Sequence, residues 1–173
     1  MSKTIRFSLD AESVERAARE VERFAEELKA LLGELVRLLT EQGAQVASVK
    51  VAQLGAVDTG ELSDSFIAEY NEQDHIGIIR SIATYAFFVE YGTGIVGAGS
   101  PHPDMGGMWT PPPSNWSDYD TNKHGEAGWW YVNKDRDGKL HWTRGMPSRP
   151  FFYETYKELE QLAQERFSQL YNG

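Results

Sequence analysis

The sequence of 173 residues contains no cysteine. This absence excludes disulfide frameworks, cysteine-ligated zinc sites and thiol catalysis. A chain of this length can bury about two thirds of its unfolded surface in one core, so it needs no covalent staple to fold. Apolar residues make up 40% of the chain and charged residues 25%, which is typical of a folded globular protein. We therefore predict a single domain over residues 1–173.

Positive charge and long apolar runs are also scarce. The chain has 17 Lys and Arg against 26 Asp and Glu, a net charge of −9, so we expect no basic face of the kind that wraps a DNA duplex. No apolar run approaches the ~18 residues that span a bilayer, which predicts no membrane association. The first ten residues form no hydrophobic signal segment, so we expect the chain to stay in the cytoplasm where it is made.

Proline and tryptophan are missing from the first hundred residues. All seven Pro lie within 101–150, all five Trp within 109–142, and ten of the sixteen Gly within 92–145. The chain therefore has a regular amino-terminal part followed by a loop-rich, aromatic part. We expect an extended loop-and-hairpin excursion over residues 95–148, with residues 95–127 as a long loop.

Apolar residues then repeat every seven positions near the amino terminus. One row begins at Val14, a second at Ala17 and a third at Ala18, and each continues for four heptads. This pattern predicts one long helix whose apolar face is three positions per heptad wide. Such a face suits packing on a sheet or bundle better than a two-stranded coiled coil, although a contact with a partner helix stays open. The pattern allows the helix to continue past Gly43.

Shorter patterns predict the remaining elements. Residues 4–9 alternate like a strand, and Ser8 or Asp10 can cap the helix that follows. Strands over 66–70 and 75–82 predict a hairpin, and 129–132 with 140–143 predict a second one around Asp137-Gly138. Short helices are expected over 61–65 and 85–91, the second ended by Gly92-Thr93-Gly94. The last helix begins near Pro150, and its apolar face comprises Tyr156, Leu159, Leu162 or Ala163, Phe167 and Leu170.

These elements predict an α+β fold. A long amino-terminal helix and a carboxyl-terminal helix pack on a small antiparallel sheet, with a long aromatic loop and hairpin inserted. Tyr85, Phe88 and Val89 are expected to anchor the short helix on the sheet. Pro150 sets the entry to the last helix, which Phe151 or Phe152 docks.

The sequence shows no catalytic or metal-binding motif. None of the four histidines pairs with another His or an acid at the helical spacing of metal ligands. We expect His102 and His124 to be solvated and His141 to lie on a sheet face. There is no nucleophile elbow around a serine and no phosphate-binding loop. We therefore predict no catalytic residue, no cofactor and no metal, and a protein that is not an enzyme.

The tryptophans allow three interpretations. They could form a platform for stacking sugars, a surface that binds a protein partner, or a small local core. The second and third interpretations are compatible with each other. The residues concerned are Trp109, Trp116, Trp129, Trp130 and Trp142.

Three segments resemble, in order, the tail-completion or neck proteins of long-tailed bacteriophages and prophages, which join head to tail. The first segment is 57–65, the second is 83–94, and the third is Arg149-Pro150-Phe151. The second is the most specific of the three. The matching residues are Thr59, Gly60 and Leu62, then Tyr85, Ala86, Glu90, Tyr91, Gly92, Thr93 and Gly94, then Pro150 and Phe151.

The resemblance implies a structural protein of the virion, located at the head–tail junction and made in the cytoplasm of the bacterial host. Copies would form a homo-oligomeric ring beside head-completion or connector proteins and tail-terminator or tail-tube proteins. DNA would pass through the lumen without sequence-specific binding, and an acidic lumen would repel it. The link over 95–148 is longer than is usual in the family.

Three alternatives stay open at this point. Within the virion, the protein could instead be a tail-terminator ring protein. Outside it, the tryptophans could serve a carbohydrate-binding protein, or the heptad helix could dimerise a cytoplasmic interaction module. Glu90 is expected to pair with an arginine, either within the chain or across a ring interface, because it is an acid inside an aromatic segment.

Overall fold

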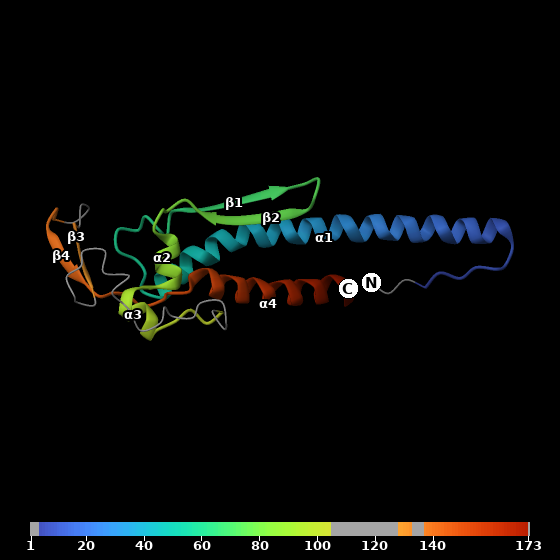
Figure 1. The fold of residues 1–173 in the computed structure, drawn as a ribbon. Coiled ribbons are helices and arrows are strands. Elements are labelled where there is room, and N and C mark those ends of the chain that lie inside the picture. The colour runs from blue at the N-terminus through green and yellow to red at the C-terminus, as the bar shows by residue number, and fades with distance from the viewer. Residues whose placement is uncertain (1–3, 105–127, 133–136, 173) are drawn as a thin grey trace. The chain divides into compact units, whose positions relative to one another are not determined.

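The computed structural model describes residues 4–104, 128–132 and 137–172 (Figure 1). The predicted α+β class is confirmed, with a long amino-terminal helix, a carboxyl-terminal helix and small antiparallel sheets. The elements in chain order are α1 (Ala11–Gln53), β1 (Phe66–Asn71), β2 (Ile76–Ser81), α2 (Ala86–Tyr91), α3 (Gly94–Gly99), β3 (Trp129–Val132), β4 (Leu140–Thr143), β5 (Gly145–Met146) and α4 (Phe151–Asn172).

The chain divides into two compact units. The first comprises residues 1–46, 67–80 and 156–173, and the second comprises 47–66 and 81–155. The expectation of a single domain over the whole chain stays a prediction.

In the first unit, the β1–β2 hairpin packs on the stretch of α1 that contains Gly33 and Gly43. A Cβ atom added to Gly33 would lie 2.5 Å from the ring of His75, and one added to Gly43 would collide with Ile79. In the other direction, a Cβ on Gly77 of β2 would collide with Thr40. These glycines let the strands lie close to the helix, which explains why a residue that weakens helices occurs twice inside α1.

Two hydrogen bonds join the residues before α1 to Ser13 in its first turn. The Ser13 N–H donates to Oδ1 of Asp10 at 2.8 Å, and the Ser8 N–H donates to Oγ of Ser13 at 2.9 Å. The predicted cap is therefore confirmed. The strand expected over residues 4–9 is wrong, because these residues pair with no strand among those the structure describes, and Phe7 and Leu9 are exposed.

The core of the second unit is formed by six buried side chains from four segments of the chain. Phe66 at the edge of this core meets the rings of Phe151 and Phe152 edge-on, with both centroid distances 5.6 Å. The helix expected over 61–65 is instead a single turn, in which the Ser65 N–H donates to the Leu62 carbonyl. The six core residues are Val51, Leu62, Ala83, Ala86, Val89 and Phe151.

The short helix predicted in the second unit is confirmed as α2, but its anchors differ in part from those expected. Ala86 and Val89 are buried and Tyr85 packs against the core, whereas Phe88 is 53% exposed. Ala86 and Val89 are three positions apart, so both face the core and the residues between them, Phe87 and Phe88, point outward.

The beginning of the expected loop over 95–127 is helical, because residues up to Gly99 belong to α3. The rest of that prediction lies largely outside the described residues, as do His124, Trp109, Trp116 and the side chain of Leu170. The second hairpin is confirmed. β3 and β4 pair antiparallel with Trp130 opposite Trp142, and the two indole rings meet edge-on at 5.4 Å.

Candidate functional site

The three motif segments of the sequence meet in the second unit. Leu62 comes from the first segment, Ala86 and Val89 from the second, and Phe151 from the third, and all four belong to its buried core. Glu90 follows Val89 directly and is itself only 4% exposed. Its carboxylate is the polar centre of this arrangement.

Glu90 caps the amino terminus of α4. Its Oε2 accepts a hydrogen bond from the Phe152 N–H at 2.8 Å, and its Oε1 accepts one from the Tyr153 N–H at 3.0 Å. These amides belong to the first turn of the helix, where N–H groups have no partner within the helix and the helix dipole is positive. Pro150, which precedes the helix, has no side-chain acceptor with which to cap it, so Glu90 supplies the cap from 62 residues upstream.

His102 completes the set of donors to Glu90. Its Nε2 lies 2.9 Å from Oε1 of Glu90, and its Nδ1 accepts a hydrogen bond from the Asp104 N–H at 3.1 Å. Because an accepting ring nitrogen carries no hydrogen, this geometry assigns the hydrogen to Nε2, which donates it to the carboxylate. The rings of Tyr91 and Tyr153 lie 4.7 and 5.5 Å from the imidazole.

Two expectations from the sequence are corrected here. His102 is 7% exposed rather than solvated, because the chain after α3 returns to α2 and places the imidazole on Glu90. Among the residues that the structure describes, the carboxylate of Glu90 is bonded to His102 and two backbone amides, and not to an arginine. The expected pairing across a ring interface stays a prediction. A lone histidine between two prolines carries no periodic signal by which the sequence could have shown this role.

The backbone around Glu90 is bonded to the approach to α4. The Ser148 hydroxyl donates to the Glu90 carbonyl at 2.6 Å, and the Arg149 N–H donates to the Val89 carbonyl at 2.9 Å. The end of α2 is therefore joined to residues 148–153 by both its main chain and its carboxylate. This set of contacts determines where α4 begins.

Gly92-Thr93-Gly94 lies directly against β5. Thr93 and Gly94 form antiparallel bridges with Met146 and Gly145, and the Met146 N–H donates to the Thr93 hydroxyl at 3.1 Å. Gly92 and Gly94 have φ angles of 76° and 61°, a region that favours glycine. A Cβ on Gly94 would lie 2.5 Å from the Arg144 carbonyl oxygen, so this contact depends on the missing side chain.

The remaining predicted site residues lie at the edges of this arrangement. The ring of Trp129 lies against Gly94, whereas Trp130 is 49% exposed on the β3–β4 hairpin, where it meets Trp142. Thr59 and Gly60 form the turn before Leu62, in which the Glu61 N–H donates to the Thr59 hydroxyl at 3.4 Å. Trp109 and Trp116 cannot be placed with them, because they lie outside the described residues.

The chemistry of this arrangement is that of a buried structural link. The carboxylate receives three hydrogen bonds, and both ring nitrogens of His102 are engaged. In the described part of the chain, no three His, Asp or Glu side chains are grouped to hold a metal ion. Within the same residues, none of the helices has the length and apolar character needed to cross a membrane.

No protein-family model matches the chain, and no curated protein or solved structure is similar to it at a significant level. The family resemblance therefore depends on the three motif segments and on their order in the sequence.

Proposed function

We propose that this protein is a structural subunit of the neck of a tailed bacteriophage, a tail-completion protein that forms a ring and joins the tail to the head. One observation carries the proposal. The three segments that resemble the family contribute to one packed unit, in which Glu90 of the second segment caps the helix opened by the third.

This convergence supports the proposal because the matched residues pack together in one part of the fold. Three short matches scattered over unrelated parts of a fold would carry little weight. Here Leu62 and Phe151 fill the same core, and Glu90 and the two glycines of Gly92-Thr93-Gly94 hold the approach to α4. The matched positions therefore fall where side chains and glycines determine the packing of this unit.

Exposed aromatic residues on α2 also suit a protein that works in an assembly. Phe87 and Phe88 are 63% and 53% exposed, and the rings of Phe87 and Tyr91 lie 4.6 Å apart. Contiguous exposed apolar groups are typical of surfaces that contact other proteins. The expected neighbours are other copies of the chain and the head-completion or connector and tail-terminator or tail-tube proteins beside the ring.

The net charge of −9 is compatible with a ring through which DNA passes, because an acidic lumen repels the phosphate backbone. DNA would then cross the ring without sequence-specific binding. A ring whose lumen is basic would contradict this part of the proposal.

Electron microscopy of phage particles that lack the protein tests the proposed function. We expect DNA-filled heads and complete tails that are not joined, and restoration of joined particles when the wild-type gene is supplied in trans. A matched lysate complemented with an exposed-site variant, Glu61→Gln, should also contain joined particles. Infectious particles of normal appearance without the protein would contradict the neck assignment.

A further inference from the structure

The two halves of α1 differ in how they are covered. Between residues 33 and 46 of the first unit, Gly33, Leu35, Thr40 and Gly43 are buried, and the β1–β2 hairpin packs there. Between residues 11 and 32 only Ser13 is buried. Figure 1 shows this amino-terminal half of α1 extending beyond the hairpin. At 1.5 Å per residue it is about 33 Å long.

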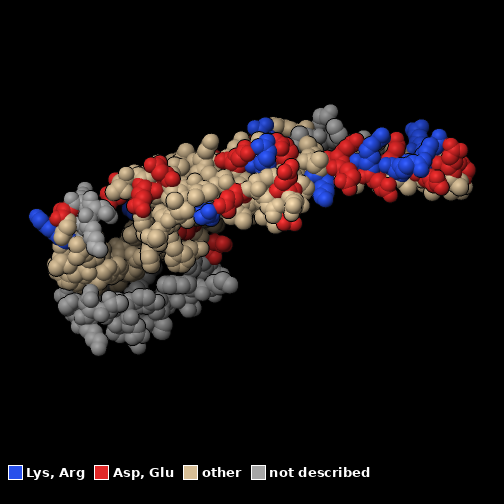
Figure 2. Space-filling model, turned by 90° about the horizontal axis from the view of Figure 1, so that it is seen from above, with Lys and Arg blue, Asp and Glu red and all other residues tan. Residues whose placement is uncertain are grey.

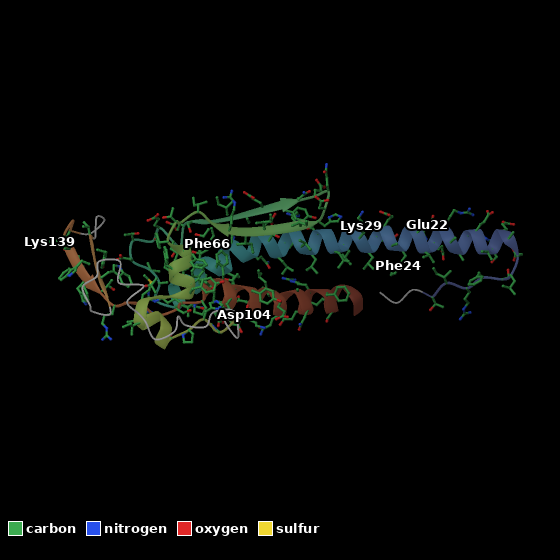
Figure 3. The ribbon with its side chains drawn as sticks, in the orientation of Figure 1. Glu22, Phe24, Lys29, Phe66, Asp104 and Lys139 are labelled. Carbon is green, nitrogen blue, oxygen red and sulfur yellow. The ribbon has the colours of Figure 1, made fainter. Side chains whose placement is uncertain are left out.

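This half of the helix carries an apolar stripe whose residues are exposed or half-buried. Val14, Val21 and Leu32 are 45%, 54% and 41% exposed. Phe24 points to one side of the helix, and Glu22 and Lys29 point to the other (Figure 3). We call the following residues the amino-terminal stripe, none of which is buried: Val14, Ala17, Ala18, Val21, Phe24, Ala25, Leu28, Leu31 and Leu32.

The polar side of the same segment stabilises the helix without a partner. Arg23 lies 3.6 Å from Glu20 and 3.9 Å from Glu27, and Arg19 lies 3.7 Å from Glu15. These pairs have the i,i+3 and i,i+4 spacings that stabilise exposed helices. These exposed pairs and the cap at Asp10 contribute to the stability of the helix, and the exposed part of its apolar side is available for a contact.

The charges beside the stripe indicate what fits on it. One edge is lined by Glu20 and Glu27, while the opposite edge is apolar and consists of Ala18, Ala25 and Leu32. If a second identical helix packs parallel to the first, the acidic edge of one copy faces the apolar edge of the next. In an antiparallel pair the two edges with Glu20 and Glu27 would face each other. Like-charge repulsion disfavours this arrangement, because the exposed pairs with Arg23 compensate the two carboxylates only in part.

The overall charge of the segment also permits identical copies to associate. Residues 11–32 contain six acidic and four basic side chains, although the whole chain has a net charge of −9. Figure 2 shows the two signs intermixed along this part of α1. Neighbouring copies therefore meet a nearly balanced surface rather than a strongly acidic one.

We propose that the amino-terminal stripe is the surface on which a second copy of this chain packs, with the two α1 helices parallel. The inference rests on the proposed function, because it names the contact surface of the proposed ring. In this packing the acidic edge of one copy contacts the apolar edge of the next. Because the contact joins two different surfaces of the chain, it is heterologous, and repeated contacts of this kind can close into a ring.

The absence of cysteine permits a direct test with the purified full-length chain. A single cysteine introduced by Val14→Cys would face its equivalent in a parallel neighbour, and a short bismaleimide should then link two copies. In an antiparallel pair centred on the stripe, residue 14 would lie opposite residue 32, and the two copies of residue 14 would be about 27 Å apart. Mixing Val14→Cys with Leu32→Cys chains detects that arrangement.

Substitutions on opposite sides of the helix provide the matched controls. Val21→Lys places a charge in the stripe and should weaken cross-linking of Val14→Cys roughly tenfold or more. Glu26→Gln changes the net charge by the same amount on the polar side and should leave cross-linking unchanged. Lysine favours a helix at least as well as valine does, so circular dichroism should show equal helix content in both variants.

The proposal is overturned if the chain stays monomeric at every concentration, if only the mixed Val14→Cys and Leu32→Cys chains link, or if Val21→Lys links as well as Glu26→Gln does. This test uses the purified chain and not the particle. Self-association through the stripe together with normal particles lacking the protein would refute the neck assignment alone. Unjoined heads and tails together with a monomeric chain would refute the stripe alone.

Discussion

The imidazole Nε2 of His102 and the carboxylate Oε1 of Glu90 lie 2.9 Å apart, with the two side chains 5% and 6% exposed. The same carboxylate accepts hydrogen bonds from the Phe152 and Tyr153 amides in the first turn of α4. One acid thus connects α2, the segment after α3 and the start of the carboxyl-terminal helix. Because the Glu90 carboxylate is buried, removal of any one of its hydrogen-bond donors leaves the buried charge with one partner fewer and destabilises the fold.

Glu90→Gln should destabilise the protein by about 2–3 kcal/mol. The amide oxygen can accept one backbone hydrogen bond, but the amide nitrogen would face another N–H donor, and the negative charge at the end of the helix is lost. Chemical denaturation followed by circular dichroism measures the change. Glu61→Gln, which changes an exposed acid in the same unit, should shift the free energy of unfolding by less than about 0.5 kcal/mol. Equal stability of the two variants would refute the capping role.

His102 should carry its hydrogen on Nε2 in the folded protein, because Nδ1 accepts the Asp104 N–H. Nitrogen NMR of the imidazole distinguishes the two ring nitrogens by their chemical shifts, and loss of the signals in His102→Gln assigns them. A hydrogen found on Nδ1 of the neutral ring would contradict the arrangement around Glu90.

Gly94→Ala should destabilise the protein by more than about 1 kcal/mol. The φ angle of Gly94 is 61°, and the added Cβ would lie 2.5 Å from the Arg144 carbonyl oxygen and 2.9 Å from the ring of Trp129. Gly99→Ala is the matched control, because its Cβ would meet nothing within 4 Å and its backbone needs no special conformation. Thermal unfolding of the two variants under identical conditions tests the difference.

Asp10 should make the start of α1 sensitive to acid. The Ser8 hydroxyl, and after it the Ser13 N–H, hold the pKa of the Asp10 carboxyl below its ordinary value of 3.8. A carboxyl whose pKa is lowered on folding stabilises the fold above its ordinary pKa, and this contribution is lost as the pH falls through the lowered value.

Helix content measured by circular dichroism tests this expectation. The wild type should exceed Asp10→Ala at neutral pH, and the difference should shrink below pH 3.8. A difference that does not change with pH would mean that the ionised carboxylate does not stabilise the first turn.

Local patterns in the sequence account for most of the secondary structure. The heptads that begin at Val14 predict α1, and turn residues such as Asp137-Gly138 predict the hairpins, because both signals depend on neighbours a few positions away. The strand expected over residues 4–9 is wrong for a related reason. Alternation describes a strand that has a partner, and these residues pair with none in the described part of the chain.

The candidate site could be predicted only in part. The sequence singles out Glu90, Gly94 and Pro150 through their resemblance to a family, but it does not show what Glu90 binds. The partners of this carboxylate are 12 and 62 or more residues away, and no periodicity extends over such distances.

By itself, the sequence determined the two long helices, α2, the hairpins and the apolar stripe of α1, because each follows from the spacing of side chains along one local segment. Only the tertiary structure decided that the β1–β2 hairpin packs on α1 after residue 32, so that buried residues are frequent there and Ser13 alone is buried between residues 11 and 32, and that His102 is buried against Glu90. Burial depends on which distant segments of the chain pack together. The hydrogen-bond donors that a buried charge requires must come from those same segments.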